Sequence, residues 1–432
     1  MAATCLCFAA GCNKDLYEAH KTSIEEEMEG SFEFFWEQTS VREEVAEGCL
    51  PTYGLIADRY PNTSQHASTA SVGFGLAAYA IGAEEGWVTK EEAETRSEKT
   101  LQTMLALQAD PDVAHEGFLA HFINMQTGKR VSNVEISSID TAILLCGAIC
   151  AGEYFGGEVK RLANEFYGNV NWKAIERKRG SKTYLTMGFN GNTHALLGDW
   201  DWYAEQLMMY VLGAGSPNEE HRIGDETYYD FARNEGEYGG HRFIYSWFGS
   251  IFTYQFSHAF INFKGYTDKN GTDWFENSVQ ASKAAYEYCR DRKDVQTFAK
   301  GGWGLTACDT PDGYSGHLGA SPRGWNSSEN LNYSKIEGTI APCGALGSVV
   351  FTPEESLNAL EHYRSQRLLN GKYGLTDAYN IDRGWVATDS IGIDKGITLL
   401  MLANYKNGCV WNAVMENENI LLGMENLGFT AA

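Results

Sequence analysis

Two kinds of apolar segment alternate along the chain. Residues 135–155 (EISSIDTAILLCGAICAGEYF) are apolar on nearly every side, whereas residues 158–167 (EVKRLANEFY) carry their charges on one face. A helix that is apolar all round is buried, and a helix with one polar face lies at the surface. The alternation therefore predicts pairs of helices, one inside the molecule and one outside.

The same order recurs over most of the chain, and few segments show the two-residue alternation of strands. Capping boxes open two of the helices at Ser23 and Thr89, and Thr352 followed by Pro353 opens a third. We expect helices at residues 23–38, 69–83, 89–108, 135–155, 158–167, 198–213, 250–263, 273–290, 353–366 and 394–406.

This pattern predicts an all-α fold of two concentric rings of helices, an (α/α) barrel. A helical solenoid is the alternative, but no repeat of fixed length is present. No linker divides residues 20–432, so we expect one domain there. Long polar, aromatic loops at 109–134, 221–247, 301–338 and 371–390 are expected to meet at one rim of the barrel, because long loops in compact domains usually build a site.

The charge of the chain narrows the classes of partner. With 34 basic and 57 acidic residues the net charge is −23, which argues against nucleic acid and anionic membrane surfaces. A neutral polymer remains possible as a ligand. Aromatic residues make up 13% of the chain, and sugar rings stack on such side chains, although a large aromatic core gives the same composition.

The N-terminus resembles a lipoprotein signal. Residues 1–12 read MAATCLCFAAGC, an apolar run of small residues that ends at Cys12, although the basic start of such signals is missing. We expect residues 1–12 to be a signal peptide with Cys12 as the lipidated residue, and the protein to be a bacterial lipoprotein, periplasmic or anchored to the outer membrane. Contact with the membrane is then expected only through the lipid.

Motifs for nucleophilic, nucleotide and metal chemistry are missing, so no metal and no cofactor are expected. The carboxylates remain as candidate catalytic groups. On a helix over 198–213, Glu205 shares a face with Trp202, Met208 and Met209, and partial desolvation there raises its pKa. Such a carboxyl can deliver a proton at neutral pH. The alternative is an amphipathic helix with an acidic, capped start.

Two other groups of carboxylates stand at or near expected helix starts. Asp140 opens the most apolar helix, where it either caps the helix or faces the barrel axis. Asp377, Asp389 and Asp394 cluster late in the chain, and Asp394 again opens a helix.

Several stretches together resemble the glycoamylase-like proteins, which include bacterial endo-β-1,2-glucanases and share an (α/α)6 barrel. These stretches are residues 54–59, 73–76, 117–130, 138–142, 202–205, 249–258, 303–314, 338–342, 351–355 and 391–396. By this resemblance Glu205 is the general acid, Asp140 an essential inner carboxylate and Asp394 the residue on the base side. The residues expected to bind substrate are Asp58, Arg59, Glu135, Trp202, Tyr254, His258, Trp303, Asp309, Tyr314, Tyr379 and Trp385.

The resemblance implies a glycoside hydrolase, with endo-type, inverting hydrolysis of β-1,2-glucan as the best hypothesis and a monomer as the expected form. Inversion needs an acid and a distant base with space for water between them. The alternatives are a surface-anchored glycan-binding lipoprotein without catalysis, a phosphorolytic relative, and a glucoamylase-type enzyme that acts on another glucan.

Overall fold

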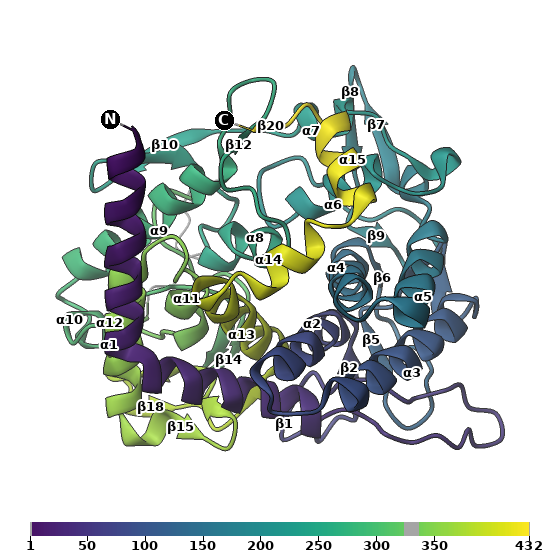
Figure 1. The fold of residues 1–432 in the computed structure, drawn as a ribbon, viewed down its shortest axis with the longest axis horizontal. Helices are drawn as coiled ribbons and strands as arrows, with labels where there is room; N and C mark the ends of the chain where they lie inside the picture. The colour runs from purple at the N-terminus through teal and green to yellow at the C-terminus, as the bar shows by residue number, and fades with distance from the viewer. Residues whose placement is uncertain (1, 324–336, 432) are drawn as a thin grey trace.

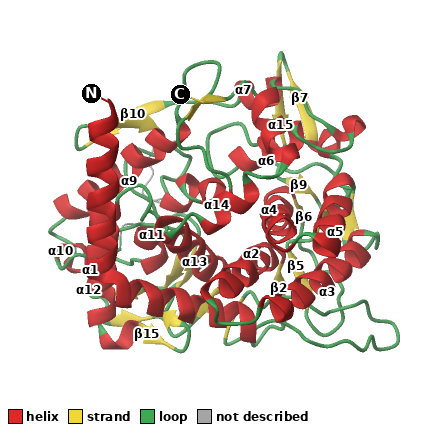
Figure 2. Cartoon of the chain, in the orientation of Figure 1, coloured by secondary structure: helices red, strands yellow, loops and turns green. Residues whose placement is uncertain are grey.

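Helices form two rings in the computed structural model, which describes residues 2–323 and 337–431. Figure 1 shows the course of the chain, and Figure 2 shows that helix dominates and that strands are short. The inner ring consists of α2 (Thr69–Glu85), α4 (Ser138–Phe155), α6 (Leu207–Ala214), α8 (Phe256–Phe260), α11 (Pro342–Leu346) and α13 (Gly392–Lys406). The main outer helices are α1 (Ala2–Glu37), α3 (Lys90–Gln108), α5 (Gly157–Gly168), α9 (Trp274–Asp291) and α12 (Pro353–Ser365).

The ring closes because α13, late in the chain, packs on α2, which packs on α4. Outer helices cover the seams: α3 packs on α2, α5 on α4, and α1 on both α13 and α2. Closure confirms the predicted (α/α)6 barrel and excludes the solenoid, whose ends would not meet. Shorter helices complete the fold: α7 (Glu226–Asp230), α10 (Gln296–Ala299), α14 (Cys409–Val414) and α15 (Glu418–Asn426), with 3-10 turns at Trp172–Ile175, Glu219–His221, Ile251–Tyr254 and Arg367–Leu369.

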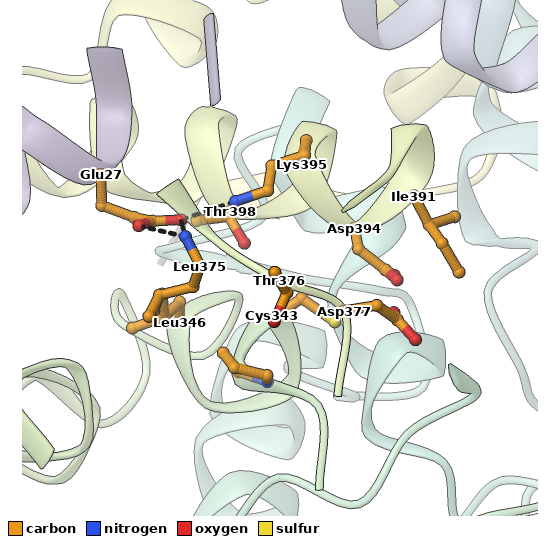
Figure 3. A pocket seen from close by; sticks show the side chains of 11 residues that line it. Glu27, Cys343, Leu346, Leu375, Thr376, Asp377, Ile391, Asp394, Lys395 and Thr398 are labelled. Atoms are coloured by element: carbon orange, nitrogen blue, oxygen red, sulfur yellow. Dashed lines mark hydrogen bonds and ion pairs between the residues drawn. The ribbon is translucent and has the colours of Figure 1, made fainter. Parts of the chain in front are cut away.

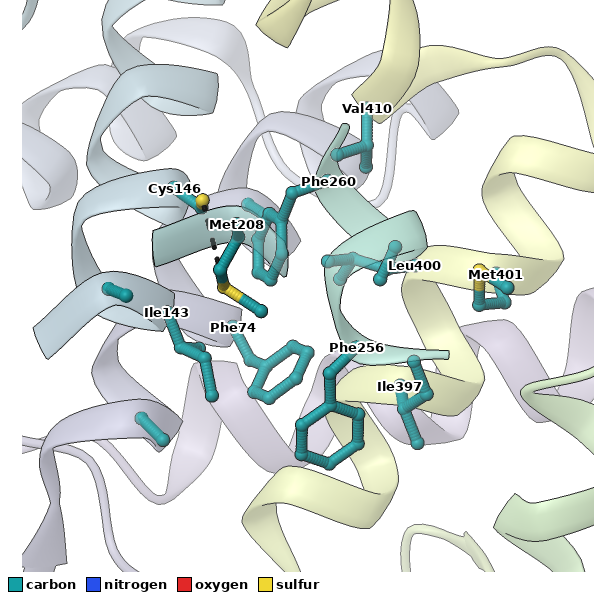
Figure 4. Packing of buried hydrophobic residues seen from close by; sticks show 14 of the residues in the cluster. Phe74, Ile143, Cys146, Met208, Phe256, Phe260, Ile397, Leu400, Met401 and Val410 are labelled. Atoms are coloured by element: carbon teal, nitrogen blue, oxygen red, sulfur yellow. Dashed lines mark hydrogen bonds between the residues drawn. The ribbon is translucent and has the colours of Figure 1, made fainter. Parts of the chain in front are cut away.

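Apolar side chains from most of the inner helices meet in the centre of the barrel. Phe74 of α2, Met208 of α6 and Phe256 of α8 point toward the same region in Figure 4, and all three are buried. Leu400 of α13 and Val410 of α14 approach it from the opposite side. The centre is therefore a packed core at this level, so a substrate site has to lie nearer one end of the barrel.

The helix α4 is long and apolar enough to cross a membrane by length and composition, as no other helix among the described residues is. However, 78% of its apolar window is buried inside the structure, as in the core helix of a closed barrel.

Helix starts agree with the sequence at several places, including Pro353 of α12, and disagree at others. Thr89 and Glu92 form the predicted capping box of α3, and Asp273 caps α9. The predicted start at Ser23 is wrong, because α1 runs unbroken from Ala2 to Glu37. Residues 13–29 contain no Gly or Pro, and an existing helix extends more easily than a new one starts. The side chains of residues 2–13 lie outside the described set, and Cys12 is among them.

Short antiparallel strand pairs connect the loops at the helix ends. Several join distant parts of the chain: β1 (Arg59–Tyr60) pairs with β19 (Ser390–Ile391), β2 (His66–Ser68) with β5 (Phe122–Asn124), β6 (Ile136–Ser137) with β9 (Gly188–Phe189), and β12 (Tyr266–Thr267) with β20 (Thr430–Ala431). The others are local hairpins: β3 (Ala114–His115) with β4 (Phe118–Leu119), β7 (Glu176–Arg179) with β8 (Lys182–Leu185), β10 (Glu235–Tyr238) with β11 (His241–Ile244), β13 (Cys308–Thr310) with β14 (Gly313–Ser315), β15 (Asn370–Gly371) with β16 (Gly374–Leu375), and β17 (Tyr379–Asn380) with β18 (Trp385–Val386).

The closest approach between inner helices predicts a sharp effect on stability. A Cβ atom added to Gly147 of α4 would lie 1.9 Å from the carbonyl oxygen of Gly73 in α2, a contact that only movement of the two backbones relieves. We expect Gly147→Ala to destabilise the protein by about 1–3 kcal/mol or more, as overpacking does. Thermal unfolding checks this, with Gly168→Ala as control, because an added Cβ there meets nothing closer than 3.9 Å. Equal melting temperatures of Gly147→Ala and wild type would contradict the packing of α2 on α4.

Candidate active site

Glu205 lies in the turn that leads into α6, not on a helix as the sequence predicted. The preceding residues are extended: Asp199 forms a β-bridge with Thr186, and Trp202 forms one with Ala232. Tertiary pairing thus overrides the helical pattern of residues 199–205. The predicted helix face, with Glu205 beside Met208 and Met209, is replaced by a turn that directs Glu205 into a cavity.

Arginines of the β7–β8 hairpin hold this extended segment in place. Arg177 Nη1 lies 2.9 Å from Asp199 Oδ1, and Arg179 Nη1 lies 3.1 Å from Asp199 Oδ2. Arg179 also reaches Asp201, with Nη2 2.6 Å from Oδ2. The two aspartates therefore anchor the backbone just before Glu205.

Aromatic side chains surround the Glu205 carboxyl. A cavity of about 330 Å³ is lined by Glu205, Asp199, Asp201, Met187, Trp200, Trp202, Trp247, Phe248 and Phe252, among others. Trp202 and Trp247 meet edge to face with ring centroids 5.2 Å apart. A wall of this kind offers flat apolar faces beside a few polar groups, which is typical of a small-ligand site.

Burial raises the pKa of Glu205 to about 7; hydrogen bonding to its own backbone opposes this rise, and the charge of Asp140 adds to it by a smaller amount. The sequence argument from desolvation therefore predicted the correct direction of the pKa shift of Glu205, although the side chain lies in a different environment from the predicted one. At neutral pH a substantial part of the Glu205 population carries a proton that it can donate.

Asp140 stands in the first turn of α4 and is linked to a charged pair on the preceding loop. Its Oδ2 accepts the hydroxyl of Ser137 at 2.5 Å, and Ser137 is the residue that caps the helix. Its Oδ1 lies 3.7 Å from Nε2 of His121, while Nδ1 of His121 lies 2.8 Å from Glu135. Burial alone lowers the pKa of His121, but Asp140 and Glu135 outweigh it and raise the pKa to about 9.

A second acidic region lies at the start of α13, which carries Asp394. The carboxyl of Asp394 faces that of Asp377, which stands between β16 and β17 (Figure 3). Both are buried, and a small enclosed cavity of about 10 Å³ borders them. Behind Asp394, Lys395 pairs with Glu27 of α1 at 2.8 Å, and both side chains are buried.

Arg59 connects this region to the rest of the site. Its Nη1 lies 3.0 Å from Asp309 and 3.3 Å from Asp389, and its Nε lies 3.3 Å from Asp58. The charge of Asp58 also raises the pKa of His121, so electrostatic interactions link Asp140, His121, Asp58 and Arg59. The backbone N–H of Asp309 donates to Asp377 at 2.7 Å, which extends the chain of contacts to Asp394.

Tyr314 is an aromatic residue that the sequence singled out and that lies near this second region. It lies opposite Asp309 in the β13–β14 hairpin, and the residue is 53% exposed. The charges of Asp394 and Asp377 act on its hydroxyl. Its exposed ring is thus available to a ligand beside the buried carboxyl pair.

Other residues predicted to bind substrate are buried and are not brought to this surface. Tyr254 accepts the backbone N–H of Ser246 at 2.7 Å, and burial lowers the pKa of His258 to about 3. Trp303 donates its indole N–H to the Glu355 carbonyl, and the Tyr379 hydroxyl lies 3.4 Å from His362. All four are at most 3% exposed, because they pack the loops onto the helices. Trp385 is half-buried on β18.

Several residues of the site were not among those assigned a role from the sequence. His121, Arg179, Trp247 and Phe252 reach it only through tertiary contacts, and Asp377, which the sequence grouped with Asp394 without a role, does so as well. Their positions in the sequence could have indicated two of them. His121 and Asp377 each lie in a long loop, and His121 belongs to one of the stretches that carry the family resemblance. Within residues 2–323 and 337–431, no group of three or more His, Cys, Asp or Glu side chains could hold a metal ion.

The chain is similar to a family of carbohydrate-active proteins. The Glycoamylase family model, described as "Putative glucoamylase", matches residues 198–418. An exo β-1,2-glucooligosaccharide sophorohydrolase (non-reducing end) from Parabacteroides distasonis is 26% identical, and the match covers 93% of this chain and 57% of that protein. The chain therefore spans just over half the length of this curated relative.

Solved structures show the same barrel. An endo-β-1,2-glucanase from Chitinophaga pinensis, in complex with sophorotriose and glucose, is 25% identical with a TM-score of 0.80, and the match covers 95% of this chain and 98% of that one. A β-1,2-glucanase from Parabacteroides distasonis shares the fold at 24% identity and a TM-score of 0.79, covering 95% of this chain and 60% of that one.

Proposed function

Because the chain belongs to the Glycoamylase family, we propose that it is a glycoside hydrolase that cleaves β-1,2-linked glucan. The observation that carries the proposal is Glu205: a partly accessible carboxyl in an aromatic cavity, with its pKa raised to about 7 by burial and by Asp140. The names of the two similar β-1,2-glucan hydrolases support the choice of linkage.

The chemistry needs an acid and a base on opposite sides of the scissile bond. Glu205 donates its proton to the glycosidic oxygen as the bond to the anomeric carbon breaks. Water attacks that carbon, and Asp394, across the site on α13, receives the proton of the water. Burial keeps Glu205 protonated, the charge of Asp140 adds to this effect, and the configuration at the anomeric carbon is inverted.

The proposed mode of attack is internal cleavage, as in the Chitinophaga pinensis enzyme that the chain resembles along nearly its whole length. The alternative is release of sophorose from the non-reducing end, the activity in the name of the Parabacteroides relative. The two modes give different products from the same polymer.

A panel of linkage-defined glucans tests substrate and mode together. We expect hydrolysis of β-1,2-glucan without added phosphate, a mixture of oligosaccharide lengths early in the reaction, and products first formed as the α-anomer by NMR. Sophorose as the sole early product would replace the endo mode by the exo mode. Binding without turnover on every glucan would instead favour a glycan-binding protein.

The role of Glu205 predicts a defined loss of rate. Glu205→Gln keeps the size of the side chain but cannot donate the proton, so turnover on the polymer should fall by about 10²–10⁴-fold. Glycosides with a good leaving group need less protonation and should lose less. Turnover on both substrates, together with thermal melting, checks this, and near wild-type turnover of folded Glu205→Gln on the polymer would exclude Glu205 as the acid.

The pH dependence of kcat/KM is a second, independent test of the role of Glu205. The acid acts only while protonated, so kcat/KM of the wild type should fall as pH rises through about 7. Asp140→Asn removes a charge that raises the pKa of Glu205, so this fall should move to lower pH. An unchanged alkaline limb in Asp140→Asn would contradict the coupling between the two carboxyls.

We further propose that Cys12 carries a lipid anchor, on the basis of residues 1–12 alone. In the native host the protein should then partition with membranes, and Cys12→Ser should release it or leave an unprocessed precursor. Cell fractionation with detection of the protein checks this. A wild-type protein found entirely in the aqueous fraction would rule out the anchor.

A further inference from the structure

Asp377 and Asp394 form a buried pair of carboxyl groups from different parts of the chain. Their side chains point toward each other in Figure 3, and they are 3% and 9% exposed. Two like charges this close and this poorly hydrated repel strongly, so such a pair is stable with one shared proton rather than none. The question is which of the two carries the proton.

The hydrogen bonds of the two residues are not equivalent. Asp377 Oδ2 accepts the backbone N–H of Asp309 at 2.7 Å, but no donor within the described part of the chain faces the buried Oδ1 if the group is ionised. A proton on Oδ1 supplies the missing hydrogen bond, because the protonated oxygen then donates to Asp394. Asp394 already accepts from the thiol of Cys343 and is therefore the better acceptor of the two.

Among the residues that the structure describes, the charged groups around the pair do not offer it an unpaired cation. Lys395 follows Asp394 on α13 but is paired with Glu27 of α1. Arg59 of β1 is shared among Asp58, Asp309 and Asp389. The charge of Asp309 acts on both carboxyls and raises the pKa of each, which adds to the repulsion. Cys308 of β13, Tyr314 of β14 and Cys343 of α11 also act on the pair but are uncharged in their ordinary protonated forms.

We propose that Asp377 keeps a proton at neutral pH and donates it in a hydrogen bond to Asp394, so that Asp394 is the ionised, oriented member that serves as the base. Asp377 is thus a positioning residue, and this inference rests on the proposed hydrolase function. Asp394 takes one proton from the attacking water in each turnover, while the proton of Asp377 stays where it is.

The electrostatics of the two groups agree with this assignment. Burial raises the pKa of Asp377 well above its usual value, and the charge of Asp394 adds to the rise. Burial also raises the pKa of Asp394, but hydrogen bonds from Asp377 and Cys343 oppose that rise. Asp394 therefore ionises first.

Substitution by Asn separates the two roles, because an Asn amide mimics a protonated carboxyl. In Asp377→Asn the NH2 group can donate to Asp394 while the oxygen accepts from Asp309, so kcat should stay within about threefold of wild type. Asp394→Asn should lose about 10²–10⁴-fold. Asp377→Ala removes the donor, which should lower kcat and move the acid limb of the pH profile to higher pH, since Asp394 then ionises less readily.

Two kinetic outcomes would overturn the proposal. A folded Asp377→Asn as inactive as Asp394→Asn would make Asp377 itself the proton acceptor. An Asp377→Ala protein with unchanged kcat and acid limb would show that Asp377 has no part in orienting or ionising Asp394.

Thermal unfolding measures the shared proton independently of activity. A carboxyl whose pKa is higher in the folded than in the unfolded state loses stability as pH rises above its unfolded value of about 3.9. Asp377→Asn has no such proton to lose, so its melting temperature minus that of wild type should grow between about pH 5 and 8. A difference that does not change with pH would overturn the proposal.

Asp382→Asn is the matched control for this measurement. Asp382 also accepts backbone N–H groups, from Gln296 and Thr297, and these outweigh the effect of burial and lower its pKa. Its melting difference from wild type should stay constant over the same pH range. If the wild type hydrolyses no β-1,2-glucan, the proposed function fails, but the melting experiment still decides the protonation of Asp377.

Discussion

The close contact of α2, α4 and α13 is the constraint on which the site depends. Glycines allow these helices to approach closely: Gly147 faces the backbone of Gly73, and Gly396 of α13 faces the ring of Phe74. Because the ring is closed in this way, Asp140 and Asp394, each in the first turn of its own inner helix, have fixed positions in the barrel. Their separation is set by helix packing and not by flexible loops.

Burial sets the charge states of the carboxyl groups. Glu205 and Asp377 are both desolvated beside a second carboxylate, Asp140 in one case and Asp394 in the other, and in both cases the pKa rises. The site thus contains two acid–carboxylate pairs, one near α4 and α6 and one at α13. Environments that push the pKa values of paired carboxyls apart are the usual basis for assigning the acid and the base.

Cationic groups connect the two pairs without neutralising them completely. His121 stands beside Asp140 and Glu135, and Arg59 stands among Asp58, Asp309 and Asp389. Arg177 and Arg179 act differently, because they fix Asp199 and Asp201 and thereby the turn that carries Glu205. The acidic rim is therefore held together by a few arginines whose partners come from distant segments.

The sequence by itself determined the fold class and the order of buried and outer helices, and it singled out three carboxylates as candidate catalytic groups. The helices follow from local information, such as the all-round apolar pattern of residues 138–155 and the capping box at Thr89. The carboxylates Glu205, Asp140 and Asp394 follow from stretches that resemble the glycoamylase-like proteins. Only the tertiary structure decided that residues 199–205 are extended, that Tyr254 and His258 are buried, and that Asp377 faces Asp394. These features depend on long-range packing that no local pattern encodes. The β-bridges join Asp199 to Thr186 and Trp202 to Ala232, and the carboxyl pair joins residues that are 17 positions apart.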